Sequence, residues 1–260
     1  MIIASGGWIV SNFTEEKGVS YVVIMNDGKI YDVDKILSDK LTHLSFLHVK
    51  ATDFPVRKFI DSKELKNGQA VLGVLANGRS WITSVNEKNE KTSDSIRFSD
   101  AYYDKISLND NLPLGAVVLS ISGDIIGIAG GNNKIEPADH ISSAIKSISL
   151  YKAIKRPSMN FSYIEFYKYI NAGKENNKSN KGILILPVAD KTMNVASTSP
   201  IFIAGMKAGD IITHASGQEL NNENNLTDIV ESYLPGDLIG FVYLRDGVEK
   251  EIEVKLSELK

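Results

Sequence analysis

Short apolar runs separated by turn residues fill the first half of the chain. Residues 8–10, 21–25 and 29–33 are rich in β-branched and aromatic side chains, and Asn26-Asp27-Gly28 joins the last two runs. Gly28 accepts the positive φ that a tight hairpin turn needs. Further runs of strand length follow at 44–49, 70–75, 81–85, 95–99, 116–120 and 124–128. Because no helical pattern interrupts them, they predict a mostly β fold, either a sandwich or a barrel.

A helical period appears only after these strands. Apolar residues at 141, 144, 145 and 148 recur at i, i+3, i+4 and i+7, which is one face of an amphipathic helix. Asp139 is the predicted N-cap, and His140 would be a structural residue of the first turn. Pro157 prevents a helix from continuing further. The pattern therefore predicts two domains, at residues 1–150 and 157–260.

Composition excludes several function classes. The chain has 260 residues, of which 43% are hydrophobic, with a formal net charge of −3 and no cysteine. It is long enough for two cores, and it lacks the basic field that holds a nucleic-acid backbone. It contains no apolar run of membrane-spanning length, no thiol ligand and no recognisable metal or nucleotide motif. We expect no cofactor, no metal, no nucleic acid and no membrane contact.

The strongest motif lies in the second domain. Residues 199–212 read SPIFIAGMKAGDII, preceded by KGILIL at 181–186 and RPSMNF at 156–161. These segments resemble the PDZ domain of HtrA (DegP) serine proteases, including its R-P-Y-L-G-I loop, whose backbone amides receive a peptide's C-terminal carboxylate. The resemblance implies a helix at about 224–233 and a hairpin formed by 238–244 and 251–256.

The first domain resembles the trypsin-like part of the same family. GDIIGI at 123–128 is similar to the G-E-V-I-G-I strand that follows the nucleophile loop. Counting back without a gap places the family's G-N-S-G-G-P-L on residues 112–118, so the nucleophile position is Leu114. The fold implied is mostly β, a trypsin-like double β-barrel followed by a PDZ domain.

The other two triad positions also depart from the family. GWIVSN at 7–12 resembles the strand before the catalytic histidine, which falls on Phe13 or Thr14. THLSFL at 42–47 resembles T-D-L-A-V-L, so His43 replaces the orienting aspartate. Leucine can neither attack a carbonyl nor release a proton, and neither Phe13 nor Thr14 can act as a general base. We therefore expect no catalytic residue in this domain.

Two alternatives to these assignments remain open. His43 and His48 lie close together and allow a relocated site, although a partly solvated polar position is favoured. Ser5-Gly6-Gly7 resembles a nucleophile loop, although a glycine-rich strand entry is favoured at this place in the chain. Asp39 and Asp53 are nearby acids that we expect to face solvent or to cap turns.

The family's peptide groove maps onto the start of the second domain. The predicted ligand-binding residues are Met159, Asn160, Phe161, Ser162, Tyr163, Leu226, Ile229 and Val230. Asn160 replaces the loop glycine, and asparagine is, after glycine, the natural choice for the positive φ this loop requires. Residues 168–180, KYINAGKENNKSN, are expected to form an exposed insertion. The alternative is that the groove is closed and the second domain serves only as a packing domain.

The resemblance implies a pseudoprotease that binds peptides or protein C-termini. The alternatives are an active serine endopeptidase with an unconventional site, or a scaffold with a closed groove. The family's anchor and trimer-forming segment precedes the region matched here, so we expect a monomer. The family also implies a location outside the cytoplasm.

Overall fold

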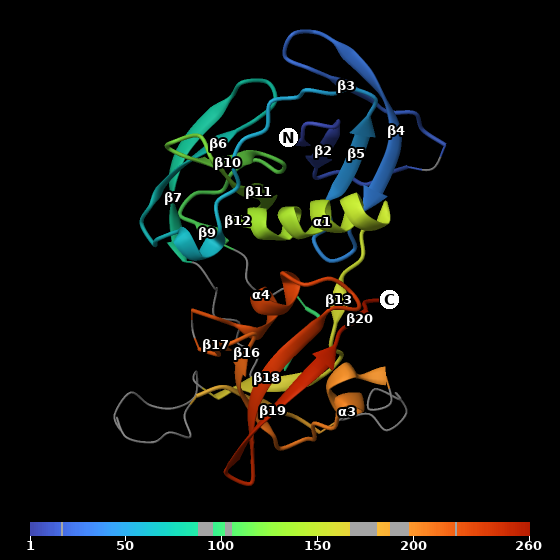
Figure 1. Cartoon of the computed structure of the whole chain (residues 1–260). Coiled ribbons are helices and arrows are strands. Elements are labelled where there is room, and N and C mark those ends of the chain that lie inside the picture. The colour runs from blue at the N-terminus through green and yellow to red at the C-terminus, as the bar shows by residue number, and fades with distance from the viewer. Residues whose placement is uncertain (17, 88–95, 102–105, 167–180, 188–197, 222) are drawn as a thin grey trace. The chain divides into compact units, whose positions relative to one another are not determined.

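The computed structural model describes residues 1–16, 18–87, 96–101, 106–166, 181–187, 198–221 and 223–260 (Figure 1). The chain divides into two compact units. The first contains Met1–Lys91 and Tyr102–Ile154, and the second contains Thr92–Ala101 and Lys155–Lys260. The second unit thus includes a short segment from the middle of the first domain predicted from the sequence. The insertion expected at 168–180 lies outside the described residues.

The first unit begins with a five-stranded antiparallel sheet in the order β1-β2-β5-β4-β3. β5 lies at its centre, and four of its five residues are buried, as expected for a strand covered on both faces. The strands are β1 (Ile2–Ala4), β2 (Trp8–Ser11), β3 (Val22–Ile24), β4 (Ile30–Ser38) and β5 (Ser45–Val49). Of these, only β1 has no counterpart in the sequence prediction.

A closed barrel follows, with the strand order β10-β11-β12-β9-β7-β6. Its interior is aliphatic, formed by side chains such as Val71, Ile126 and Ile135. The strands are β6 (Ala70–Val74), β7 (Ser80–Glu87), β9 (Ile106–Leu108), β10 (Val117–Ser120), β11 (Ile125–Gly131) and β12 (Lys134–Pro137). β9 and β12 have no counterpart in the sequence prediction. A 3-10 turn, η1 (Ser62–Glu64), precedes the barrel.

The predicted amphipathic helix is present as α1 (Ala138–Tyr151). Its apolar face packs in one cluster with residues of the five-stranded sheet and of β11. The prediction that Asp139 caps it is wrong. Pro137 is the N-cap and makes no side-chain bond, while Asp139 accepts a hydrogen bond of 2.9 Å from the Ser62 amide. The helix ends at Lys152, which has a φ of 57°, before Pro157 is reached.

The second unit is built on a larger antiparallel sheet with the path β19-β18-β16-β15-β14-β8, and β17 pairs with β16. Its strands are β8 (Arg97–Phe98), β14 (Ser162–Glu165), β15 (Ile183–Ile185), β16 (Ile211–Ala215), β17 (Gln218–Glu219), β18 (Leu238–Arg245) and β19 (Val248–Lys255). A separate two-stranded sheet pairs β13 (Pro157–Ser158) with β20 (Ser257–Glu258). The helices are α3 (Pro200–Ala204) and α4 (Leu226–Glu231). The hairpin was predicted well, whereas α4 is shorter than the expected 224–233.

β8 has an unexpected partner. The run 95–99 was predicted as a strand of the first domain, but Arg97–Phe98 pairs with β14 of the second unit. Strand propensity alone does not identify a pairing partner, because it reflects only how a side chain fits a pleated surface. This pairing is the reason residues 92–101 belong to the second unit.

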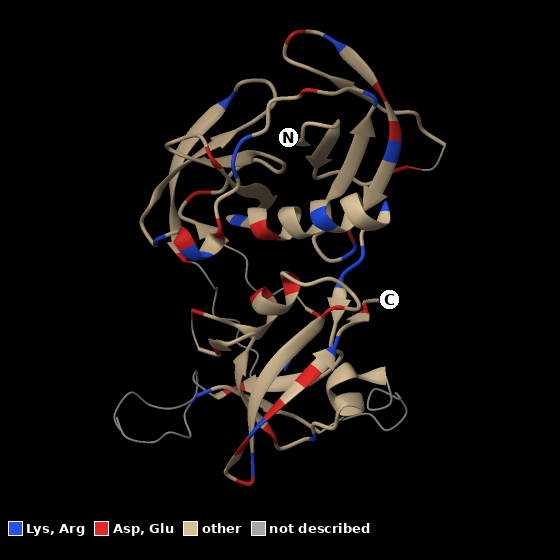
Figure 2. Ribbon diagram, in the orientation of Figure 1, with Lys and Arg blue, Asp and Glu red and all other residues tan. Residues whose placement is uncertain are grey.

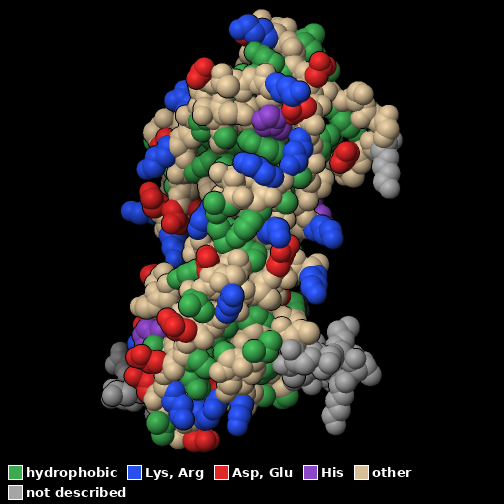
Figure 3. Space-filling model, turned by 45° about the vertical axis from the view of Figure 1, so that its right-hand side comes forward, with side chains coloured by type: hydrophobic (Ala, Val, Ile, Leu, Met, Phe, Trp, Pro, Cys, Tyr) green, Lys and Arg blue, Asp and Glu red, His purple; other side chains and the backbone are tan. Residues whose placement is uncertain are grey.

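Charged side chains of both signs are interspersed on each unit (Figures 2 and 3). β19 shows this clearly, since its sequence is VEKEIEVK and only Val254 is buried. In the described part of the chain, no helix is both long and apolar enough to cross a membrane.

Candidate functional site

The predicted nucleophile position lies in a tight turn at the entrance of β10. The Ala116 amide donates to the Pro113 carbonyl at 3.0 Å, and Gly115 has a φ of 80°. A positive φ at the third residue of a turn is typical of type II, which glycine best tolerates. Leu114 occupies the second position of the turn and is 59% exposed. A leucine side chain therefore projects where the family pattern has its serine.

The start of this segment is built into the barrel core. Leu112 stands at the first glycine of the family pattern, yet it is only 3% exposed and packs with the barrel's aliphatic cluster. Gly73 leaves room for it, since a Cβ added there would lie 2.7 Å from Leu112 Cδ1. The turn is thus held by apolar packing. Replacing Leu114 alone would leave that packing in place.

The structure brings the predicted base and acid positions to the same end of β2 and β5. Ser11 pairs with Ser45, and the Ser45 hydroxyl donates to the Phe13 carbonyl at 2.8 Å. Phe13 is half-buried against the Tyr21 ring, with ring centroids 5.3 Å apart, and Thr14 is exposed. The two segments that resemble the family's base and acid regions therefore lie side by side in the structure. Their residues at the triad positions are not the histidine and aspartate of the family pattern.

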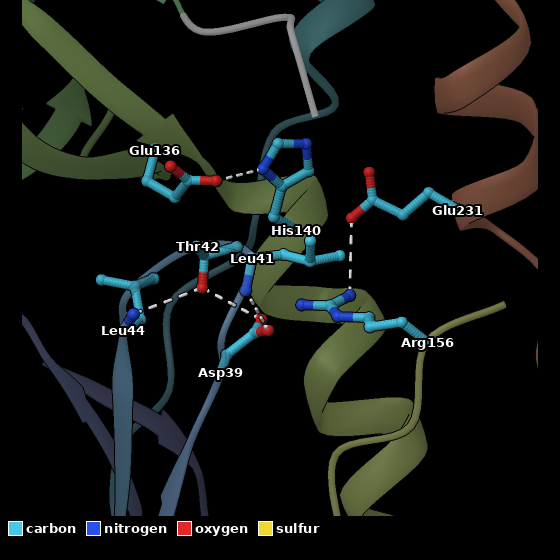
Figure 4. A network of polar contacts seen from close by, with 8 residues as sticks. All are labelled: Asp39, Leu41, Thr42, Leu44, Glu136, His140, Arg156 and Glu231. Carbon is cyan, nitrogen blue, oxygen red and sulfur yellow. Dashed lines mark hydrogen bonds and ion pairs between the residues drawn. The ribbon is translucent and has the colours of Figure 1, made fainter. Parts of the chain in front are cut away.

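His43 lies in a turn held by Asp39, whose bonds to Leu41 and Thr42 are drawn in Figure 4. The Asp39 carboxylate accepts from the Leu41 amide at 3.1 Å and from the Thr42 hydroxyl at 3.0 Å, and the His43 amide donates to the Asp39 carbonyl. His43 itself is exposed and has a φ of 56°. The expectation that Asp39 caps a turn is confirmed. The carboxylate nearest to His43 in the sequence is therefore engaged within the turn.

Two further contacts in Figure 4 are buried ion pairs, each within one unit. His140 Nδ1 bonds Glu136 Oε1, and both side chains are 4% exposed. Arg156 Nη1 lies 3.6 Å from Glu231 Oε1 in the second unit. His140 lies in the first turn of α1, as predicted, and ties that turn to β12.

His48 is engaged on both sides of its ring. Nδ1 lies 2.6 Å from Asp34 Oδ1, and Nε2 lies 3.1 Å from the Gly6 carbonyl. The hydrogen bond from His48 lowers the pKa of the Asp34 carboxyl below its ordinary value.

This pair gives a prediction for pH titration. A carboxyl whose folded pKa is depressed stabilises the fold above its unfolded value of about 3.9, and the stabilisation is lost as the pH falls through the folded pKa. We expect His48→Gln to raise the Asp34 pKa, measured by NMR titration of its carboxyl carbon. Asp27, whose pKa is lowered by Lys29, is the internal control and should not move. An unchanged Asp34 pKa would contradict the assignment.

The predicted carboxylate loop has the expected backbone conformation. Asn160 has a φ of 53°, which confirms the left-handed conformation predicted for it. The amides of Met159 and Asn160 both donate to Asp100 Oδ1, at 2.9 and 3.0 Å. The Phe161 amide donates to the Ser99 hydroxyl at 3.1 Å. The loop therefore holds a carboxylate, and that carboxylate comes from the chain itself.

The apolar residues predicted to line the groove form part of the core. Met159, Phe161, Leu226, Ile229 and Val230 belong to one buried cluster, and none is more than 4% exposed. The remaining predicted residues, Ser162 and Tyr163, pair with Phe98 and Arg97 across β14 and β8. The structure thus brings all eight residues to one region of the second unit. Their role in binding a peptide stays a prediction.

Sequence reasoning missed Arg97, Ser99 and Asp100 as residues of this site. They lie about sixty positions before the loop they contact, and no motif in the sequence connects the two segments. Among the described residues, no group of three or more histidines, cysteines or carboxylates is placed to hold a metal ion.

Comparisons with known proteins agree with this architecture. The family described as a PDZ domain matches residues 174–256. The Serine protease Do-like HtrA of Bacillus subtilis (strain 168) is 25% identical over 96% of this chain and 60% of its own length. The probable periplasmic serine protease do/HhoA-like of Haemophilus influenzae is 24% identical over 99% of this chain and 57% of its own length. The chain thus spans less than two thirds of these relatives.

Solved structures show the same fold. The HtrA-type protease AlgW with tripeptide superimposes with a TM-score of 0.68 at 17% identity, covering 100% of this chain and 88% of the other. AlgW with decapeptide gives a TM-score of 0.62 at 17% identity, covering 100% and 82%. These comparisons confirm the predicted fold class, a mostly β protein with barrels and a PDZ domain. The chain is therefore similar to HtrA/DegP serine proteases over nearly its whole length, and residues 174–256 match the PDZ domain family.

Proposed function

We propose that this protein is a catalytically inactive HtrA-like pseudoprotease whose PDZ domain binds peptides or protein C-termini. The observation that carries the proposal is Leu114, an exposed leucine in the turn where the family pattern has its nucleophile. Acyl transfer needs a nucleophile and a base within hydrogen-bond reach of each other. Leu114 has no nucleophilic atom, and neither Phe13 nor Thr14 can act as the general base.

The surroundings of Leu114 support the same proposal. Pro113 has no amide hydrogen, and the amides of Gly115 and Ala116 donate to the carbonyls of Ala129 and Pro113. These two bonds fix the conformation of the turn that carries Leu114.

Peptide recognition is supported by the PDZ domain and by the related structures. The two AlgW structures contain a tripeptide and a decapeptide, and several relatives are named as periplasmic proteases. By this relationship, the protein acts outside the cytoplasm as an adaptor or scaffold in protein quality control or envelope processes. Single-strand peptide additions of this kind bind weakly, on the order of micromolar, or about 8 kcal/mol.

Calorimetric titration tests the proposal. A peptide with an apolar last residue and a free carboxylate should bind, whereas the same peptide ending in an amide should bind far more weakly, because the loop amides recognise an anion. Asn160→Gly should retain binding. Asn160→Val should weaken it by about 1–2 kcal/mol, the cost of a β-branched residue at positive φ. Equal binding of acid and amide would contradict the proposal.

The structure also favours a second candidate, a scaffold whose groove is closed. The pairing of β8 with β14 uses the strand edge that a peptide would need. In that case, neither peptide would bind to any variant.

A further inference from the structure

β8 pairs with β14 in the way that an extended peptide adds to an exposed sheet edge. The strands are antiparallel, Phe98 pairs with Ser162 and Arg97 with Tyr163, and the Ser99 amide donates to the Phe161 carbonyl at 2.9 Å. In strand addition, backbone hydrogen bonds provide affinity and side-chain pockets provide specificity. The segment thus makes the backbone contacts of a bound ligand.

The Asp100 carboxylate occupies the place of a peptide's terminal carboxylate. Oδ1 accepts from the Met159 and Asn160 amides and from the Ser99 hydroxyl at 2.8 Å, and Oδ2 accepts from the Ser158 hydroxyl at 2.5 Å. Asp100 is only 9% exposed. Hydrogen bonds to an ionised acceptor are shorter and stronger than those between neutral groups. The carboxylate is therefore bound by a preformed set of converging donors.

A buried ion pair fixes the other end of the segment. Arg97 Nε lies 2.8 Å from Glu165 Oε2, and the two side chains are 5% and 4% exposed. Breaking this contact would leave two buried charges without a partner, which costs free energy. The ion pair therefore holds Arg97 opposite β14 in a single register. Phe98, between these anchors, is 37% exposed.

We propose that residues Arg97–Asp100 are an internal ligand of the PDZ groove, which competes with external peptide C-termini for the Met159–Phe161 amides and the β14 edge. This inference rests on the proposed peptide-binding function and specifies how that site is regulated. A peptide binds only to the fraction of molecules in which the segment has left, so its apparent Kd is raised by the inverse of that fraction.

Asp100→Asn tests the internal ligand without any peptide. The asparagine side chain is uncharged and replaces one acceptor oxygen with an N–H donor, so it binds the converging donors of the loop more weakly. The amides of Met159 and Asn160 should therefore exchange hydrogen at least about tenfold faster than in the wild type. The amides of the β18–β19 hairpin report whether the unit remains folded. Asp237→Asn is the matched control, because Asp237 also accepts a backbone amide, that of Leu234 at 2.8 Å. Unchanged exchange at Met159 and Asn160 would overturn the inference.

An engineered disulfide tests the competition on one molecule. The Ser99 amide donates to the Phe161 carbonyl, and the Ser162 carbonyl accepts from the Leu186 amide. Phe98 and Ser162 are therefore a non-hydrogen-bonded pair, whose Cα atoms lie about 4.5 Å apart in antiparallel sheets, within disulfide range. The chain has no cysteine, so Phe98→Cys with Ser162→Cys creates a single possible bridge. The oxidised form should not bind the free-acid peptide. The reduced form of the same double variant should bind it, and Asp100→Asn should bind it about tenfold more tightly than the wild type does.

The outcomes separate the two proposals. If the oxidised protein binds the peptide as well as the reduced protein, or if no intramolecular bridge forms, the segment is not the occupant and the inference fails. If the bridge forms and Asp100→Asn exposes the loop amides, the internal ligand is established. A peptide that then binds to no form would refute only the peptide-binding function. Should Asp100→Asn fail to fold, the oxidised and reduced pair still decides the question.

Discussion

The purified protein is expected to release no fragments from casein or short peptide substrates above the buffer background. Loss of a single triad member costs on the order of 10⁴- to 10⁶-fold in kcat, and the losses do not add, because the groups act as a unit. Here all three positions differ from the family pattern, at Leu114, His43 and either Phe13 or Thr14. A fluorogenic peptide assay and gel analysis of casein measure this directly.

Leu114→Ser is expected to be as inactive as the wild type. It would supply a hydroxyl without a base, in a turn still packed through Leu112 and lacking a donor at Pro113. Labelling with a fluorophosphonate is the complementary measurement, since the probe reacts with an activated serine wherever it lies. A labelled serine on the wild-type protein would support the unconventional endopeptidase and sink the pseudoprotease.

Gly182→Ala is expected to destabilise the PDZ domain by about 3 kcal/mol. Gly182 has a φ of 91°, and a Cβ placed there would lie 2.2 Å from the Ile212 carbonyl oxygen on the neighbouring strand. The substitution combines backbone strain with a steric overlap against β16, which cannot move without breaking its own pairing. Denaturant unfolding monitored by circular dichroism would measure the change.

Gly209→Ala is the matched control. Gly209 has a φ of 93°, nearly that of Gly182, but a Cβ there would meet no atom within 4 Å. Gly209→Ala should lower the free energy of unfolding by only about 1 kcal/mol, the strain of an alanine in the left-handed backbone conformation. Equal destabilisation by the two substitutions would show that close backbone approach is not the reason for glycine at position 182.

The motif at residues 199–212 made the fold of the second unit predictable from the sequence. Pro200, Gly205, Gly209 and Asp210 each meet a local backbone requirement, at a helix start, at positive φ or in a turn. Asp210 further holds Arg245 through two bonds of 2.8 and 2.7 Å, and this pairing raises the pKa of the guanidinium. Such requirements act over a few residues, so a linear pattern shows them. The conformation of Asn160 was predictable for the same reason.

The sequence by itself determined the mostly β class, the approximate division into two domains and the leucine at the position of the family's nucleophile, because each depends on local pattern or on residue identity. Only the tertiary structure decided which strand covers the β14 edge and which carboxylate fills the Met159–Phe161 loop. Asp100 and Met159 meet through long-range pairing. A strand's sequence specifies which face it buries but not its neighbour in the sheet, since backbone hydrogen bonds are alike for every partner.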